Sequence, residues 1–245
     1  MGKRAAIEWM CYPYFSSQSV FAKILDRKEG GSFEIRTTGR YRTSQRYIED
    51  TNIIETVFES DKDSFRVLDF FPRYKKISTK KSRVIKHNFL VRIVEPIKGK
   101  PEISVDFEPK LNYARNQTFI KKTDDEKLEI HNHGVNDTNL FLESNLDRDK
   151  ILNKEKFILG HRHFFVLGNT EDHKIDLKKC LTWFRSTKNY WKKWVGTLVL
   201  PEENRDIIKR SALVLKLLTF GGTGAIIAAP TTSIPEEVGS ERCFD

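Results

Sequence analysis

Two carboxylates and one glycine-rich turn are the first places in this sequence where chemistry could occur. Asp106 and Glu108 alternate on one face of a strand pattern, where they could act as an acid and base pair. Alternation along a half-exposed strand explains both acids without a catalytic role. The turn Gly221-Gly222-Thr223-Gly224 lacks the lysine and the preceding strand of a phosphate-binding loop, so we expect no nucleotide site there.

Two pairs of histidines have the spacing of potential metal ligands. His161 and His163 alternate on one strand face, as do His131 and His133, so each pair could offer two ligands to a metal ion. Neither pair has a third ligand at a recognisable spacing. We therefore expect polar strand ends, no metal site and no bound cofactor.

Three tryptophans near the end of the strand-rich region could form a platform for carbohydrate. They are Trp183, Trp191 and Trp194. Because they adjoin a strongly apolar helix pattern, packing in the core is the better interpretation.

The elements that must position these side chains are mostly strands. In the run Glu102–Glu108, apolar residues alternate with acids or serine, which is typical of a half-buried strand in an antiparallel sheet. Turn sequences separate the runs, and many short strands with few helices predict a mainly β fold, an antiparallel β-sandwich. Similar runs lie at residues 52–59, 65–71, 88–94, 127–130, 139–142, 163–167 and 196–200.

Two stretches have helical spacing instead. Apolar positions within residues 176–194 predict a short helix. A broad apolar stripe predicts a second helix over residues 201–220, with Pro201 in its first turn and Gly221 just past its end. The change of period places a domain boundary near residue 200.

Composition limits the kinds of partner. The formal net charge is +9, and residues 73–86 hold seven basic residues and no acid. A basic run between two strand patterns is most often a solvated loop, so nucleic-acid binding is the weaker hypothesis. Residues 211–229 are nearly long enough to cross a membrane, but Lys216 and the following glycines favour a buried helix and a loop.

The cysteines and the N-terminus indicate the compartment. Cys11, Cys180 and Cys243 are odd in number and far apart, with no CxxC spacing. The first residues do not show the basic, apolar and small-residue regions that follow one another in a signal peptide. We expect three free thiols and a cytoplasmic protein.

Several motifs resemble one enzyme family. Residues 210–219 read RSALVLKLLT and residues 224–236 read GAIIAAPTTSIPE, which closely resembles the RSALVLK and TGAIxAAPTTSLPE pattern of glycoside hydrolase family 15, the glucoamylase and trehalase-like enzymes. Residues 7–22, IEWMCYPYFSSQSVFA, look like that family's IDWLCxPxFDSxSxFA. Weaker matches at residues 46–56, 67–72 and 190–194 extend the resemblance over essentially the whole chain.

The resemblance implies an N-terminal β-sandwich packed on an (α/α)6 barrel that hydrolyses α-glucosidic bonds with inversion. The substrate would be an α-glucan, a maltooligosaccharide or trehalose. In this family both catalytic glutamates follow the PTTSLPE motif, on the barrel. Neither can be matched before Asp245, so we expect no catalytic residue in this chain.

The most family-like loop contains Tyr12, Tyr14 and Phe15. The resemblance places it near the mouth of the barrel, where these aromatic rings could stack on a sugar and form the rim of the substrate pocket. The alternative is that they fill the interface between sandwich and barrel.

The sequence thus predicts a sandwich domain over residues 1–200. Residues 201–245 would be a linker, the first barrel helix and the following loop, the start of a truncated catalytic domain. We expect this chain to be inactive alone and to self-associate through the helix. The alternatives are a stand-alone glucan-binding or interaction module and a basic nucleic-acid binder.

Overall fold

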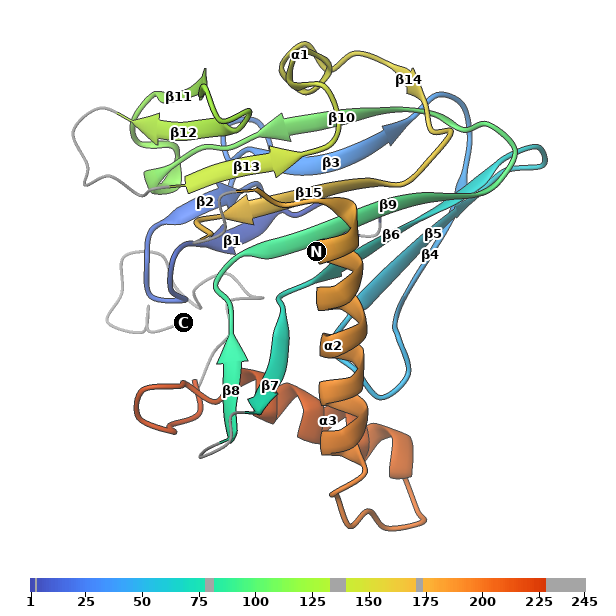
Figure 1. The fold of residues 1–245 in the computed structure, drawn as a ribbon, viewed down its shortest axis with the longest axis vertical. Coiled ribbons are helices and arrows are strands. Elements are labelled where there is room, and N and C mark those ends of the chain that lie inside the picture. The colour runs from blue at the N-terminus through green and yellow to red at the C-terminus, as the bar shows by residue number, and fades with distance from the viewer. Residues whose placement is uncertain (3, 78–81, 133–139, 171–173, 228–245) are drawn as a thin grey trace.

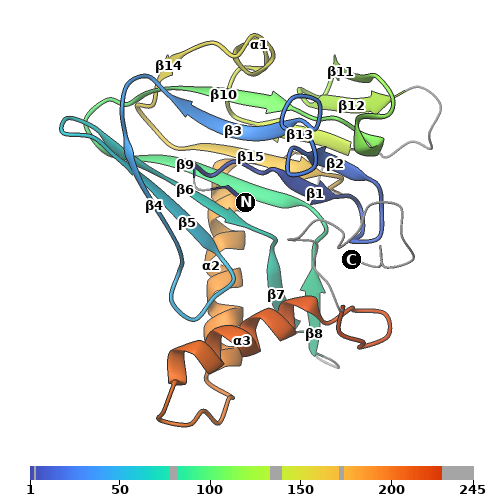
Figure 2. The same ribbon diagram turned by 180° about the vertical axis from the view of Figure 1, so that it is seen from behind.

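A computed structural model of the chain describes residues 1–2, 4–77, 82–132, 140–170 and 174–227. Within these ranges strands predominate, and two antiparallel sheets face each other across a core (Figures 1 and 2). The predicted antiparallel β-sandwich followed by a helix is confirmed.

The larger sheet has eight strands, and every neighbouring pair is antiparallel. Consecutive strands pair as a meander at each end of this sheet, and strands that are not consecutive in the chain pair in its middle and join the two ends. From edge to edge the strands are β11 (Thr118–Lys122), β12 (Leu128–Asn132), β13 (Leu140–Ser144), β15 (His163–Gly168), β9 (Leu90–Lys98), β6 (Ser64–Phe70), β5 (Ile54–Glu59) and β4 (Arg42–Tyr47).

The smaller sheet consists of β14 (Phe157–Ile158), β10 (Glu102–Glu108) and β3 (Ser32–Thr37). Its register pairs Phe107 with Phe33, and the two rings meet edge to face with centroids 5.2 Å apart. The Phe33 ring also packs edge to face on the ring of Phe165 in the large sheet, with centroids 5.6 Å apart. The half-buried strand predicted from the alternation in β10 is therefore confirmed, because the apolar face of β10 packs in the core between the two sheets.

A helix covers the opposite face of the large sheet. This helix, α2 (Leu177–Val195), begins where the Asp176 carboxylate accepts a hydrogen bond from the Lys179 N–H. It buries Cys180 and Trp183 in a second apolar cluster on the sheet. The predicted short helix is therefore confirmed, and it runs for 19 residues.

Two hairpins extend the sandwich. One joins β1 (Trp9–Cys11) to β2 (Ser19–Ala22), and the other joins β7 (Arg73–Ile77) to β8 (Ser82–Lys86). The solvated loop predicted for residues 73–86 is therefore wrong. The strand-forming residues Tyr74, Val84 and Ile85 pair across the hairpin, and α2 packs against it.

The last helix is α3 (Arg205–Leu218), which crosses the lower ends of α2 and of the β7–β8 hairpin (Figure 2). It begins four residues later than predicted, so Pro201 precedes the helix. Residues 196–200 form a turn and an extended segment, and the strand predicted there is wrong. Two short elements complete the fold, α1 (Arg148–Leu152) and a 3-10 turn (Asn112–Ala114). Among the described residues no helix is long and apolar enough to cross a membrane.

Candidate functional site around α3

The turn between β4 and β5 holds α3 on the sandwich through polar contacts. Asn52 Nδ2 donates a hydrogen bond to the Leu213 carbonyl at 3.0 Å, and Arg210 Nη1 donates one to the Thr51 carbonyl at 2.8 Å. Arg210 also donates to the side-chain oxygen of Asn52, and its guanidinium lies over the Tyr47 ring at 4.0 Å. We call Tyr47, Asn52 and Arg210 the latch.

Two further contacts support the latch. Lys209 Nζ forms an ion pair with Asp50 Oδ1 at 2.8 Å. Leu213 is only 2% exposed. One side of α3 is thus fixed on the sandwich by hydrogen bonds, charge and apolar burial.

The other side of α3 is apolar and exposed. Ile207 and Leu215 are 69% and 50% exposed, and Ile208 and Val214 are 38% and 37% exposed. These positions repeat at helical spacing, so they form one stripe. We call this stripe the outer face of α3. An apolar stripe of this kind is typical of a surface that another part of the protein covers.

The aromatic loop between β1 and β2 has one buried ring and two exposed rings. Tyr12 is buried, and its hydroxyl accepts a hydrogen bond from the Asn169 N–H at 2.6 Å. Tyr14 and Phe15 are 56% and 55% exposed, and the Phe15 ring meets that of Phe220 edge to face at 5.7 Å. The loop therefore lies beside the end of α3. The rim of a substrate pocket stays a prediction for all three residues.

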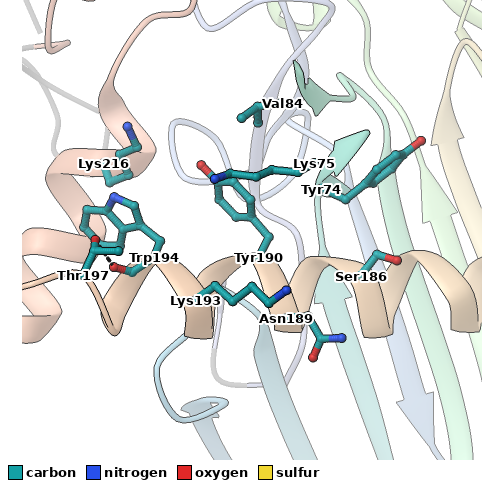
Figure 3. Close-up of a pocket in the computed structure, with 10 residues that line it drawn as sticks. All are labelled: Tyr74, Lys75, Val84, Ser186, Asn189, Tyr190, Lys193, Trp194, Thr197 and Lys216. Carbon is teal, nitrogen blue, oxygen red and sulfur yellow. Dashed lines mark hydrogen bonds between the residues drawn. The ribbon is translucent and has the colours of Figure 1, made fainter. Parts of the chain in front are cut away.

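A pocket of about 590 Å³ opens between α2, α3 and the β7–β8 hairpin (Figure 3). One stripe of α2 supplies most of its wall, because positions 186, 189, 190, 193 and 194 recur at helical spacing, and Thr197 lines the pocket from the turn that follows the helix. The lining residues are Tyr74, Lys75, Val84, Ser186, Asn189, Tyr190, Lys193, Trp194, Thr197 and Lys216. This lining contains three lysines and no carboxylate.

The buried acids of the described residues are all neutralised. The pairs are Glu55 with Arg46 and Arg66, Asp69 with Arg92, Glu95 with Arg66 and Arg162, Asp106 with Arg36 and Lys154, and Glu143 with Lys127. Burial alone would raise the pKa of Glu55, but hydrogen bonds from Arg46 and Arg66 hold that pKa below its usual value. Burial raises the pKa of both Asp69 and Glu143.

The surface position expected for Asp106 is wrong. Asp106 is 1% exposed, because the segment around α1 packs on the outer side of β10. Lys154 Nζ pairs with Asp106 at 2.7 Å and also pairs with Glu108. Burial would lower the pKa of Lys154, but the two carboxylates raise it. A single lysine thus binds both acids, and neither is free to act as a general base.

The histidine pairs do not form a cluster of metal ligands. No group of three or more potential ligands able to hold a metal ion occurs in the part of the chain that the structure describes. His163 lies in β15 with its ring 4.4 Å from that of His161, which precedes the strand. His131 stacks on Phe119 at 5.7 Å, and His133 lies outside the described residues.

The tryptophans divide between core and pocket. Trp183 and Trp191 are 3% and 2% exposed, as core packing requires. The Arg73 guanidinium lies 4.9 Å over the Trp191 ring, and Trp194 reaches the pocket. Cys11 and Cys180 are free thiols, and burial raises the pKa of Cys180. Cys243 lies outside the described residues.

Sequence patterns did not identify the latch or the pocket. Asn52 and Arg210 lie within two of the motifs that resemble the family, so their positions carried a signal. Their contact spans 158 residues, which local periodicity does not detect.

Comparison with known proteins gives consistent matches. The sequence model of the family described as "Trehalase-like, N-terminal" matches residues 1–144. A trehalase of Thermoplasma acidophilum is 32% identical over 252 residues, which cover 98% of this chain and 41% of the relative. A trehalase of Thermoplasma volcanium is 34% identical over 263 residues, covering 98% of this chain and 38% of the relative.

More distant relatives match over the same extent. A trehalase of Mycobacterium tuberculosis is 27% identical over 267 residues, with 98% of this chain and 38% of the relative covered. The chain thus spans about two fifths of the length of the curated relatives that it matches. No solved structure matches it.

Proposed function

We propose, from the premise that this chain belongs to the trehalase-like N-terminal family, that it is the structural N-terminal domain of an enzyme that hydrolyses trehalose. The relatives that match 98% of the chain are trehalases, which favours trehalose over maltooligosaccharides and longer α-glucans. The motifs around residues 7–22 and 210–236 support membership of glycoside hydrolase family 15.

The observation that carries this proposal is the two-sided character of α3. The latch fixes one side of the helix on the sandwich, and the outer face carries apolar side chains such as Ile207 and Leu215 into solvent. A helix fixed on one domain with an apolar stripe on its other side is suited to join that domain to a second one. The catalytic barrel is the partner that we assign to this stripe.

The paired acids support a non-catalytic role. Inverting hydrolysis needs one carboxylic acid to protonate the leaving oxygen and a second carboxylate to activate water. Each buried acid in the described residues is bound to a basic side chain, and the pocket beside α3 contains no acid. The 245-residue polypeptide should therefore lack activity.

The first prediction is that the purified 245-residue chain releases no glucose from trehalose above a blank without enzyme. The trehalase of Thermoplasma acidophilum serves as the positive control under the same conditions. Glucose release that disappears in the variant Asp69→Asn or Glu143→Gln would place catalysis in this chain and contradict the proposal.

A further inference from the structure

The pocket beside α3 combines aromatic rings with unneutralised positive charge. Tyr74, Tyr190 and Trp194 form aromatic parts of its wall, and Lys75, Lys193 and Lys216 reach it from three different elements (Figure 3). Its volume of about 590 Å³ lies within the range of small-molecule pockets, about 300–1,000 Å³. A concave pocket of this size can hold a small ligand.

Among the described residues, the lysines that line the pocket form no ion pair. Within the described residues, no carboxylate lies within 4 Å of Lys75, Lys193 or Lys216. Arg36 and Lys154 elsewhere in the sandwich are ion-paired. In the part of the chain that the structure describes, positive charge is therefore concentrated beside α3.

Two neighbouring cations increase this imbalance. The Arg73 guanidinium lies over the rings of Tyr190 and Trp191, and its buried Nη1 has no hydrogen-bond partner within the described ranges. Burial lowers the pKa of Lys86, and the charges of Arg73 and Lys216 lower it further. An anion bound nearby would relieve this repulsion, since opposite charges at short range stabilise one another.

The aromatic residues specify more than charge. Tyr190 and Trp194 are one helical turn apart on the same side of α2, so their rings line one wall. Ser186 and Asn189 add a hydroxyl and an amide group on the same stripe, and Thr197 adds a hydroxyl group from the turn after α2. Aromatic faces with hydroxyl and amide partners suit a sugar-sized ring that carries several hydroxyl groups.

We propose that this pocket binds a small organic anion, a hexose-sized ring that carries a phosphate or a carboxylate. The lysines bind the oxyanion, and Trp194 and Tyr190 contact the ring. All residues that line this pocket belong to the described part of this chain, so binding can be tested without the hydrolytic function proposed above.

The experiment is a titration of the 245-residue chain followed by tryptophan fluorescence. Glucose 6-phosphate and glucuronate are the two oxyanion probes, and glucose, trehalose and inorganic phosphate are the comparisons. We expect one of the oxyanion sugars to change the emission in a saturable way. Neutral sugars and inorganic phosphate should bind at least about tenfold more weakly, because each lacks one of the two recognised groups. Raising the salt concentration should weaken binding.

Variants locate the site. Lys193→Gln and Lys216→Gln should each weaken binding about tenfold, and Trp194→Phe should abolish most of the signal. Lys178→Gln, which removes the same charge near the opposite end of α2, should leave binding unchanged. Circular dichroism spectra that match the wild-type spectrum would confirm that each variant is folded.

Three outcomes would overturn the proposal. The first is the absence of saturable binding by both oxyanion sugars. The second is equally tight binding of inorganic phosphate, which would remove the ring from recognition. The third is binding of a pentaglutamate peptide or a DNA oligonucleotide while the sugars fail, which would assign the charge to a macromolecular partner.

Discussion

Arg92 is a charged residue buried in the centre of the sandwich. Its side chain is fully buried and pairs with Asp69 through two nitrogens, at 2.7 and 3.2 Å. It also donates to the carbonyls of Phe33 and Ala5, and its guanidinium lies 4.4 Å over the Phe33 ring. One side chain thus joins the N-terminal segment, the small sheet and the large sheet.

We predict that Arg92→Met destabilises the chain by about 3–5 kcal/mol, because it leaves the Asp69 carboxyl buried without its partner. Lys122→Met is the matched control, since the Lys122 and Asp149 side chains are 41% and 61% exposed. Its cost should stay below about 1 kcal/mol. Urea unfolding curves measure both values, and equal midpoints for the two variants would show that the Arg92 contacts are not critical.

The lowered pKa of His163 leads us to predict that the free energy of unfolding depends on pH. Burial, together with the charges of His161 and Lys150, lowers the pKa of His163 from 6.5 to about 4. The unfolded chain therefore binds more protons between these two values, so stability falls as the pH falls from 6.5 towards 4. Its contribution should be about 1–2 kcal/mol, because solvent near the exposed His161 screens part of the shift.

The variant His163→Phe should flatten this part of the profile, and His161→Gln should alter it little. Chemical unfolding at pH values from 4 to 7 measures the slope. A wild-type slope that persists unchanged in His163→Phe would assign it to other groups.

At the scale of elements, local periodicity correctly predicted strands and helices whose buried face is set by their own sequence. The alternation in β10 and the helical spacing in α2 both appear in the structure because one face of each is buried. The predictions were wrong where contacts with distant parts of the chain determine the local structure. The β7–β8 hairpin is ordered by pairing and by α2, and Asp106 is covered by a distant segment. Residues 196–200 have strand-forming side chains but no partner strand.

The latch gives a prediction for α3. Arg210→Gln removes the hydrogen bond to Thr51 and the contact with Tyr47, so α3 should open more easily. Amide exchange in α3 should accelerate by at least about tenfold, since a hydrogen bond from a charged group contributes about 1.5–3 kcal/mol. Arg205→Gln is the control, because the one hydrogen bond of the Arg205 side chain among the described residues goes to the nearby Leu200 carbonyl. Equal exchange rates in both variants would show that the latch does not hold the helix.

At the scale of the whole molecule, the sequence predicted the sandwich and the helix but not how they meet. Their junction depends on contacts between residues about 160 positions apart, such as Asn52 with Leu213. The pocket likewise combines α2, α3 and the β7–β8 hairpin. Such sites are set by three-dimensional packing, and the motifs around residues 46–56, 190–194 and 210–219 marked part of their positions in the sequence.

The exposed side of α3 leads to a prediction for the isolated chain. Ile207 and Leu215 remain 69% and 50% exposed, and covering an apolar side chain contributes about 1.5–3 kcal/mol. We therefore expect the 245-residue chain to form dimers or larger species as its concentration rises. The double variant Ile207→Gln and Leu215→Gln should stay monomeric, and light scattering over a concentration series measures the difference.

Leu213 provides the control for this effect. Although it belongs to the same apolar helix, Leu213 is 2% exposed against the sandwich, so it is not part of the outer face. Leu213→Gln should therefore lower the melting temperature and loosen α3 rather than abolish association. A wild-type chain that stays monomeric at every concentration would show that the outer face is stable in water. That result would remove the support for our proposal that a catalytic barrel covers this face.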